Sequence, residues 1–201
     1  MKTLVLDAMG VIYSVGDDVQ DLLYPFIIEK GGTTDFSIVE KYYHLASLGK
    51  MSALEFWKVV GIPPQLEDEY LQRLKLTDGL IDFLKKVKSR GLEIWCLSND
   101  LSEWSEKLRI RFGLDKYLRG FVISGDVGIR KPDPMIYQNL LNRLNVKANN
   151  VIFVDDRPKN LEPASALGFN TILFSPTNNN EVLSRTYLKA ATFNDVLAFL
   201  D

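Results

Sequence analysis

Four short apolar runs of this sequence end beside polar residues whose side chains could bind an anion and react with it. Asp7 follows the first run, 4–6, and Ser98 and Asn99 follow the second run, 94–97. Such runs are typical of strands buried on both faces of a parallel sheet. Because ligands bind outside the carboxyl ends of these strands, we expect the polar side chains to meet there. A carboxylate can attack phosphorus or carbon, and hydroxyl, amide and backbone N–H groups can bind anionic oxygens.

Lys131 follows the third run, 121–123, and lies in a proline-rich frame. Pro132 and Pro134 hold this segment out of a helix and restrict the residues before them, so the ammonium group is aimed. A fixed lysine can neutralise charge on a nucleophile and on a transferring phosphoryl group. The alternative for any single lysine is a solvated surface position, and the proline frame favours the functional interpretation.

Two adjacent carboxylates, Asp155 and Asp156, end the fourth run, 151–154. Beside Asp7 they would repel one another, because each like-charge pair at ~4 Å and an effective dielectric of ~20 costs about 4 kcal/mol. A hard divalent cation among the oxygens makes such crowding tolerable, and Mg²⁺ suits carboxylates, waters and a substrate phosphate. The pattern therefore predicts a magnesium site. A helix N-cap without metal is the alternative.

Composition favours an ordinary soluble globular protein. The chain has 201 residues, of which 46% are hydrophobic and 25% charged, and a formal net charge of −2. This balance, without a basic run that contains aromatics, argues against nucleic acid and acidic membranes as partners. The N-terminal apolar stretch is too short for a signal peptide, and no window approaches the ~20 apolar residues of a membrane span. We expect a cytoplasmic location.

The single cysteine and the single histidine exclude two kinds of chemistry. Cys96 cannot form an internal disulfide, and its place in a strand-like run predicts a buried apolar role. His44 lies in a helical stretch where packing is the expected role, and one histidine excludes a His-rich zinc site.

Strand-like and helical patterns alternate along the chain and predict an α/β fold with a doubly wound parallel sheet. The expected strands are 3–7, 92–97, 121–124, 151–155 and 170–174. The expected helices are 78–90, 102–112, 134–144, 160–167 and 194–200. Residues 178–180 read as a polar loop.

The span between the first two strands is too long for one crossover. Residues 15–76 read as about four helices, and Ser52 with Glu55 forms a capping box that opens one of them. We therefore predict a small all-helical domain at 15–76, inserted after the first strand and lying over the sheet edge. The remaining residues, 1–14 and 77–201, form the predicted core domain.

With these four motifs in this order, the chain resembles the haloacid dehalogenase superfamily of phosphotransferases and hydrolases over essentially its whole length. The matching segments are 4–11, 96–99, 130–134 and 153–156. The helical insert is similar to the family's small cap domain. Residues 160–168 are similar to the segment after the fourth motif in glucose-phosphate phosphatases and the phosphatase domain of soluble epoxide hydrolase.

This resemblance implies a magnesium-dependent phosphatase for a small phosphorylated metabolite. The sequence leaves a monomer and a homodimer both open. Asp7 would attack phosphorus, and water would hydrolyse the aspartyl-phosphate. The implied magnesium ligands are Asp7, the backbone carbonyl of Met9, Asp155 and Asp156. The residues implied to bind the phosphoryl oxygens are Ser98, Asn99 and Lys131, of which Ser98 and Lys131 act in catalysis with Asp7.

The residue two places after the nucleophile departs from the phosphatase pattern. Phosphatases of this family usually carry a second Asp there as general acid and base, whereas this chain has Met9. General acid–base catalysis contributes ~10²–10⁴ in rate, so a slower enzyme is one consequence. Aryl and anomeric phosphates leave with less protonation. Asp17, Asp18 and Asp100 are the carboxylates that could substitute.

Two other functions therefore remain beside the phosphatase. A 2-haloacid dehalogenase likewise lacks the second Asp but needs no metal, and the Asp155–Asp156 pair counts against it. A non-catalytic binding protein that keeps the anion and magnesium site is supported by Met9 alone.

Overall fold

Six parallel strands form one central sheet in a computed structural model that describes residues 2–176 and 187–200. The strands are β1 Thr3–Leu6, β2 Glu93–Ser98, β3 Gly120–Ile123, β4 Val151–Asp155, β5 Asn170–Phe174 and β6 Leu188–Ala190. Their order, β3-β2-β1-β4-β5-β6, reverses direction between β1 and β4. This is the strand order of doubly wound sheets, in which ligands bind at the reversal. The predicted fold class is confirmed.

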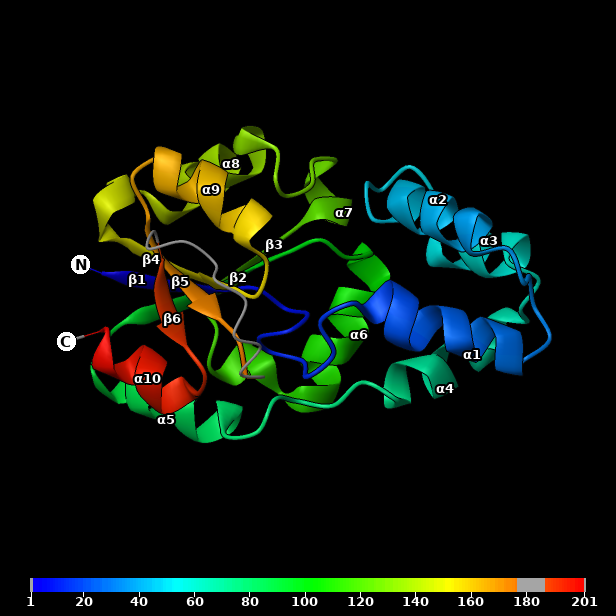
Figure 1. The fold of residues 1–201 in the computed structure, drawn as a ribbon, viewed down its shortest axis with the longest axis horizontal. Helices are drawn as coiled ribbons and strands as arrows, with labels where there is room; N and C mark the ends of the chain where they lie inside the picture. The colour runs from blue at the N-terminus through cyan, green and yellow to red at the C-terminus, as the bar shows by residue number, and fades with distance from the viewer. Residues whose placement is uncertain (1, 177–186, 201) are drawn as a thin grey trace.

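Helices cover both faces of the sheet (Figure 1). They are α5 Leu80–Ser89, α6 Ser102–Phe112, α7 Ser124–Val127, α8 Pro134–Leu144, α9 Pro158–Ala166 and α10 Phe193–Ala198. Side chains of β1 alternate between the faces, because Val5 packs with α8 and α9 whereas Leu4 and Leu6 pack with α5 and α10. β1 and β4 are therefore buried on both sides, as their apolar sequences require.

The insert between β1 and β2 is helical and lies beyond the carboxyl ends of the strands (Figure 1). Its elements are a π-helix Val19–Leu23, α1 Tyr24–Glu29, α2 Phe36–Ala46, α3 Ala53–Val59, a 3₁₀ turn Pro64–Leu66 and α4 Glu67–Gln72. The predicted capping box is present, since Ser52 N donates to Glu55 Oε2 at 2.9 Å and Glu55 N donates to Ser52 Oγ at 3.3 Å. The division into core and cap domains stays a prediction.

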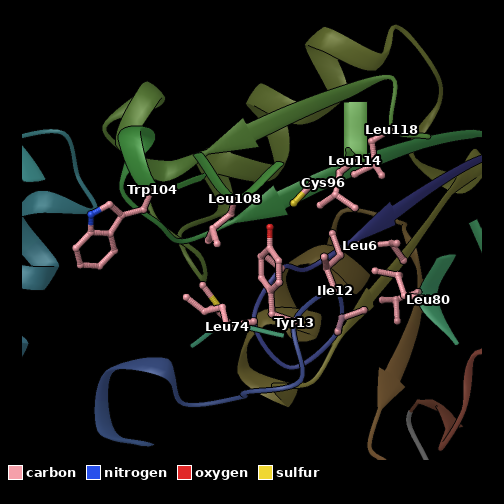
Figure 2. Close-up of a cluster of buried hydrophobic side chains, with 14 of the residues drawn as sticks. Leu6, Ile12, Tyr13, Leu74, Leu80, Cys96, Trp104, Leu108, Leu114 and Leu118 are labelled. Carbon is pink, nitrogen blue, oxygen red and sulfur yellow. The ribbon is translucent and has the colours of Figure 1, made fainter. Parts of the chain in front are cut away.

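A cluster of buried apolar side chains anchors the loop after β1. Tyr13 of this loop inserts among Leu6, Leu74 and Leu108, with its hydroxyl directed toward Cys96 (Figure 2). Cys96 is buried as predicted, and burial raises the pKa of its thiol. The loop that carries Asp7 is therefore fixed by packing as well as by the sheet.

Several predicted boundaries differ from the structure. The fourth core helix begins at Pro158 rather than residue 160, because proline suits the first helical turn. The third strand ends at Ile123, and Ser124 begins the four-residue helix α7, which was not predicted. The polar loop predicted at 178–180 lies outside the described residues. Within the described ranges, no helix combines the length and apolar character needed to cross a membrane.

Candidate active site

A buried lysine joins two carboxylates at the point where the strand order reverses. Lys131 Nζ lies 2.7 Å from Asp7 Oδ1 and 2.8 Å from Asp155 Oδ2. The ammonium comes from the segment before α8, whereas Asp7 directly follows β1 and Asp155 ends β4. All three side chains are nearly inaccessible to solvent. Burial lowers the pKa of Lys131, but the charges of Asp155 and Asp7 outweigh it, so the pKa is raised and the lysine stays protonated.

Both oxygens of Asp155 are already hydrogen-bonded. Oδ1 accepts from the Arg157 backbone N–H at 2.8 Å, and Asn160 Nδ2 lies 3.0 Å from Oδ1 and from Oδ2. With Lys131 on Oδ2, this carboxylate is held in one orientation. Sequence reasoning missed Asn160; its place in the first turns of α9, five residues after Asp155, is the signal that could have found it.

Asp156 points at the backbone of Gly10 and has a free oxygen. Gly10 has a φ of +79°, and a Cβ on it would overlap the Asp156 carboxylate. Asp156 Oδ1 is buried and has no hydrogen-bond partner within 2–176 and 187–200. An orphaned, desolvated carboxylate oxygen costs free energy unless a cation or donor reaches it.

The three carboxylates are close enough to share one cation. Asp7, Asp155 and Asp156 each offer an oxygen, and these oxygens lie within 4.8 Å of one another. Burial, and then the charge of Asp155, raise the pKa of Asp7 well above its usual range and that of Asp156 to about 6. The lysine supplies one positive charge for three carboxylates. The donor set therefore fits a hard divalent cation such as Mg²⁺.

Ser98 and Asn99 lie at the carboxyl end of β2 beside this cluster. The Asn99 side chain clamps the backbone of Lys131, since Nδ2 donates to Lys131 O at 2.9 Å and Oδ1 accepts from Lys131 N at 2.8 Å. Ser98 Oγ is buried and unpartnered in the described part of the chain. Ser98 is thus a free donor, whereas Asn99 positions the lysine.

A cavity of about 280 Å³ opens over these residues. From the core it is lined by Asp7, Met9, Ser98, Asn99, Arg130, Lys131, Arg157, Lys159 and Asn160. From the insert it is lined by Asp17, Asp18, Val19, Gln20, Phe36, Glu40, Tyr43 and His44. Of the predicted site residues, Asp155 and Asp156 are outside this lining and lie behind Lys131 and Gly10. The lining holds four cationic side chains that could bind an anion, Arg130, Lys131, Arg157 and Lys159, together with four carboxylates.

Two polar side chains of the insert take part in this lining. Asp18 is buried and accepts a hydrogen bond from Tyr43 Oη at 3.0 Å. Burial raises the pKa of Asp18 to about 6. His44, expected to be a packing residue, is exposed and borders the cavity.

Comparisons with known proteins place the chain in a family. The model of haloacid dehalogenase-like hydrolases matches residues 1–168. The chain is 33% identical over 119 residues to (S)-2-haloacid dehalogenase 4A of Burkholderia cepacia, covering 59% of this chain and 51% of that protein. It is 27% identical over 196 residues to glyceraldehyde 3-phosphate phosphatase of Methanopyrus kandleri, covering 81% and 83% respectively.

A solved structure shares the fold over most of both chains. It is a haloacid dehalogenase-family enzyme of Bacteroides thetaiotaomicron in a magnesium complex, with a TM-score of 0.75, 18% identity and coverage of 92% and 96%. The chain spans about half the length of the Burkholderia relative, or 51%. With the family model matching most of its length, the chain belongs to the haloacid dehalogenase-like hydrolases.

Proposed function

We propose that this chain is a magnesium-dependent phosphatase that hydrolyses a small phosphorylated metabolite through an aspartyl-phosphate on Asp7. The observation that carries the proposal is the buried cluster in which Lys131 bridges Asp7 and Asp155 beside the orphaned oxygen of Asp156. The similarity to glyceraldehyde 3-phosphate phosphatase of Methanopyrus kandleri, which extends over 83% of that protein, supports it.

Asp7 is held ready for attack on phosphorus. Its Oδ1 accepts from the Ala8 backbone N–H at 2.6 Å and pairs with Lys131, so these contacts leave Oδ2 as the attacking oxygen. Lys131 and the free hydroxyl of Ser98 would bind the phosphoryl oxygens and stabilise the charge that develops on them.

The proposed magnesium ligands are Asp7, Asp156 and the backbone carbonyl of Met9, with Asp155 completing the acidic cluster. When bound, the ion neutralises charge on the phosphoryl and carboxylate oxygens. Asp155 acts mainly through Lys131, because its two oxygens already accept hydrogen bonds from Lys131, Arg157 and Asn160.

The test is phosphate release from p-nitrophenyl phosphate and a panel of sugar phosphates, with Mg²⁺ and with a chelator. We expect release that requires Mg²⁺ and falls to background in Asp7→Asn. Asp82→Asn, which removes an exposed carboxylate of α5, is the matched control and keeps full activity. Release that survives Asp7→Asn contradicts the proposal. Beryllofluoride binding without any hydrolysis would indicate a binding protein instead.

A second candidate is a 2-haloacid dehalogenase-like hydrolase. It is favoured by Met9, which lines the cavity where phosphatases of the family carry an acid, and by the 33% identity to the Burkholderia relative. Metal-independent chloride release from a 2-chloro acid, lost in Asp7→Asn, would establish it.

A further inference from the structure

The proposed reaction needs a group that protonates the leaving oxygen and then deprotonates water, and Met9 can do neither. The inference that follows rests on the proposed phosphatase function. The sequence points to three carboxylates as candidates for the missing group: Asp17, Asp18 and Asp100. Glu40 and His44 also line the cavity, but both are exposed. The structure separates the three carboxylates by their access to the cavity.

Only one of the three is both buried and in the cavity lining. Asp100 is buried, but its Oδ1 accepts from Leu101 N at 2.8 Å and it is not among the described residues that line the cavity. Asp17 lines the cavity but is exposed, caps Gln20 N at 3.1 Å and faces Arg157 at 3.8 Å. Asp18 lines the cavity with an exposure of 5%.

The segment that carries Asp18 lies directly on the acidic cluster. A Cβ on Gly16 would come within 3.0 Å of Asp156 Oδ2, and Arg157 Nη2 donates to Gly16 O at 2.7 Å. Asp18 is two residues farther along the chain and shares the cavity with Asp7. A substrate phosphoryl group on Asp7 would therefore have its leaving group on the side of the insert, toward Asp18.

The surroundings of Asp18 suit proton transfer near neutral pH. Tyr43 Oη donates to Asp18 Oδ2 at 3.0 Å, which leaves Oδ1 to carry the exchangeable proton. Burial raises the pKa of Asp18 to about 6, the charge of Asp17 adds to this, and Tyr43 and Arg157 oppose it. The charged or titratable groups that face Asp18 are Tyr43 of α2, Tyr70 of α4, Arg157 after β4, Asp17 of the same loop and Asp100 after β2.

We propose that Asp18 is the general acid and base of the reaction, in place of the residue that Met9 does not provide. As Asp7 Oδ2 bonds to phosphorus, the bond from phosphorus to the leaving oxygen breaks, and that oxygen takes its proton from the Asp18 carboxyl. Water then attacks phosphorus and gives a proton to the Asp18 carboxylate, while the bond to Asp7 breaks and its electron pair returns to Asp7. Tyr43 is a positioning residue.

The test is the dependence of rate on the leaving group. A sugar phosphate needs a protonated leaving oxygen, whereas p-nitrophenolate leaves as a stable anion. We expect Asp18→Asn to lower kcat/KM for the best sugar phosphate by ~10²–10⁴-fold and to lower it far less for p-nitrophenyl phosphate. Asn still accepts the Tyr43 hydrogen bond, so the fold is preserved. Asp21→Asn, a matched change three residues away at an exposed position outside the cavity lining, keeps both rates.

The pH profile gives a second readout that a structural role would not move. In the wild type, kcat/KM for the sugar phosphate falls above about pH 6 as Asp18 loses its proton, and Asp18→Asn lacks this fall. The substrate's own ionisation, near pH ~6, appears in both proteins and cancels in their ratio. Because the Tyr43 hydrogen bond lowers the pKa of Asp18, Tyr43→Phe shifts the fall to higher pH.

Two results would overturn the inference while the phosphatase function stands: equal losses for both substrates in Asp18→Asn, or a wild-type pH profile in that variant. A wild type with no Asp7-dependent phosphate release would instead overturn the proposed function, and this inference with it.

Discussion

Several carboxylates at this site are buried in surroundings that disfavour their ionised form, and their charge therefore opposes folding. The positive charge of Lys131 balances part of the negative charge on Asp7 and Asp155. Asp7, Asp18 and Asp156 nevertheless all have raised pKa values, chiefly because they are buried. A buried ionised carboxylate without full compensation lowers stability. When such a buried carboxylate at a functional site is replaced by a neutral side chain of the same shape, the protein is expected to become more stable.

Asp18→Asn is therefore expected to stabilise the protein at neutral pH. The folded pKa of Asp18, about 6, is raised above 3.8, so its ionisation opposes folding. The wild type accordingly loses stability as the pH rises from about 4 through about 6, and the variant does not. At 1.36 kcal/mol per pKa unit, the difference approaches roughly 3 kcal/mol above that window.

Urea unfolding of both proteins, without metal, at pH values on either side of this window measures the difference. Asp21→Asn, which changes an exposed carboxylate that is not among the groups shifting the pKa of Asp18, is the control. A variant less stable than the wild type above pH 6 would show that the charge of Asp18 supports the fold.

At the scale of elements, the turn after β1 matters most, because it positions Asp7, the proposed nucleophile, and leaves the space for Asp156. Asp7 N still donates to Val154 O at 2.9 Å, so sheet pairing continues one residue past the strand. Gly10 then takes a left-handed conformation and leaves the volume in which the Asp156 carboxylate sits.

Gly10→Ala is expected to displace Asp156 and to weaken Mg²⁺ binding by at least ~10-fold, the lower end of the effect of disturbing a metal site's supporting groups. Gly79→Ala is a matched control, because Gly79 has the same φ of +79° but no atom within 4 Å of the position of its Cβ. Both variants carry the same backbone strain. A difference between their Mg²⁺ affinities, measured by titration calorimetry, therefore reports the displacement of Asp156 alone. Equal affinities in the two variants would contradict this role of Gly10.

The sequence was sufficient to predict those elements that have a strong local signal. Five buried strands were predicted within one or two residues, because continuous apolar runs flanked by turn residues leave few alternatives. The strand β6 was missed because it has only three residues, of which Leu188 and Lys189 are exposed. The helix α7 was missed because four residues show no periodicity.

The candidate site likewise contains residues that the sequence could place and residues that it could not. Asp7, Ser98 and Lys131 could be placed together because strand ends share one edge of a parallel sheet. The hydrogen bonds of Asn160 to Asp155 and the access of Asp18 to the cavity could not be predicted, because they depend on how α9 and the insert pack against the sheet. Side chains from separate units meet only through tertiary contacts.

In the whole molecule, an aromatic cluster joins the insert to the core. Trp104 of α6 is 2% exposed, and its ring lies 5.3 Å from Trp57 and 5.0 Å from Tyr70 of the insert. Glu67 Oε2 accepts from the indole N–H of Trp57 at 2.8 Å and of Trp104 at 2.9 Å. The insert and core therefore share one packed interface and should unfold together.

Trp104→Ala is expected to lower the free energy of unfolding by ~3–5 kcal/mol, the range for loss of a large buried aromatic ring. Ile110→Ala on the same helix is the control, because Ile110 is 64% exposed and its loss is expected to change stability by less than ~0.5 kcal/mol. Denaturant unfolding followed by tryptophan fluorescence and by far-UV circular dichroism measures both. Separate transitions for insert and core in the wild type would contradict a shared interface.

The aromatic interface between the insert and α6 also bears on the proposed reaction. The proposed nucleophile, Asp7, directly follows a strand of the sheet, whereas the proposed proton donor belongs to the insert. Their alignment therefore depends on the packing of the aromatic rings of the insert against α6. Any displacement of the insert from α6 would carry the proposed donor away from Asp7 and would stop proton transfer to the leaving group.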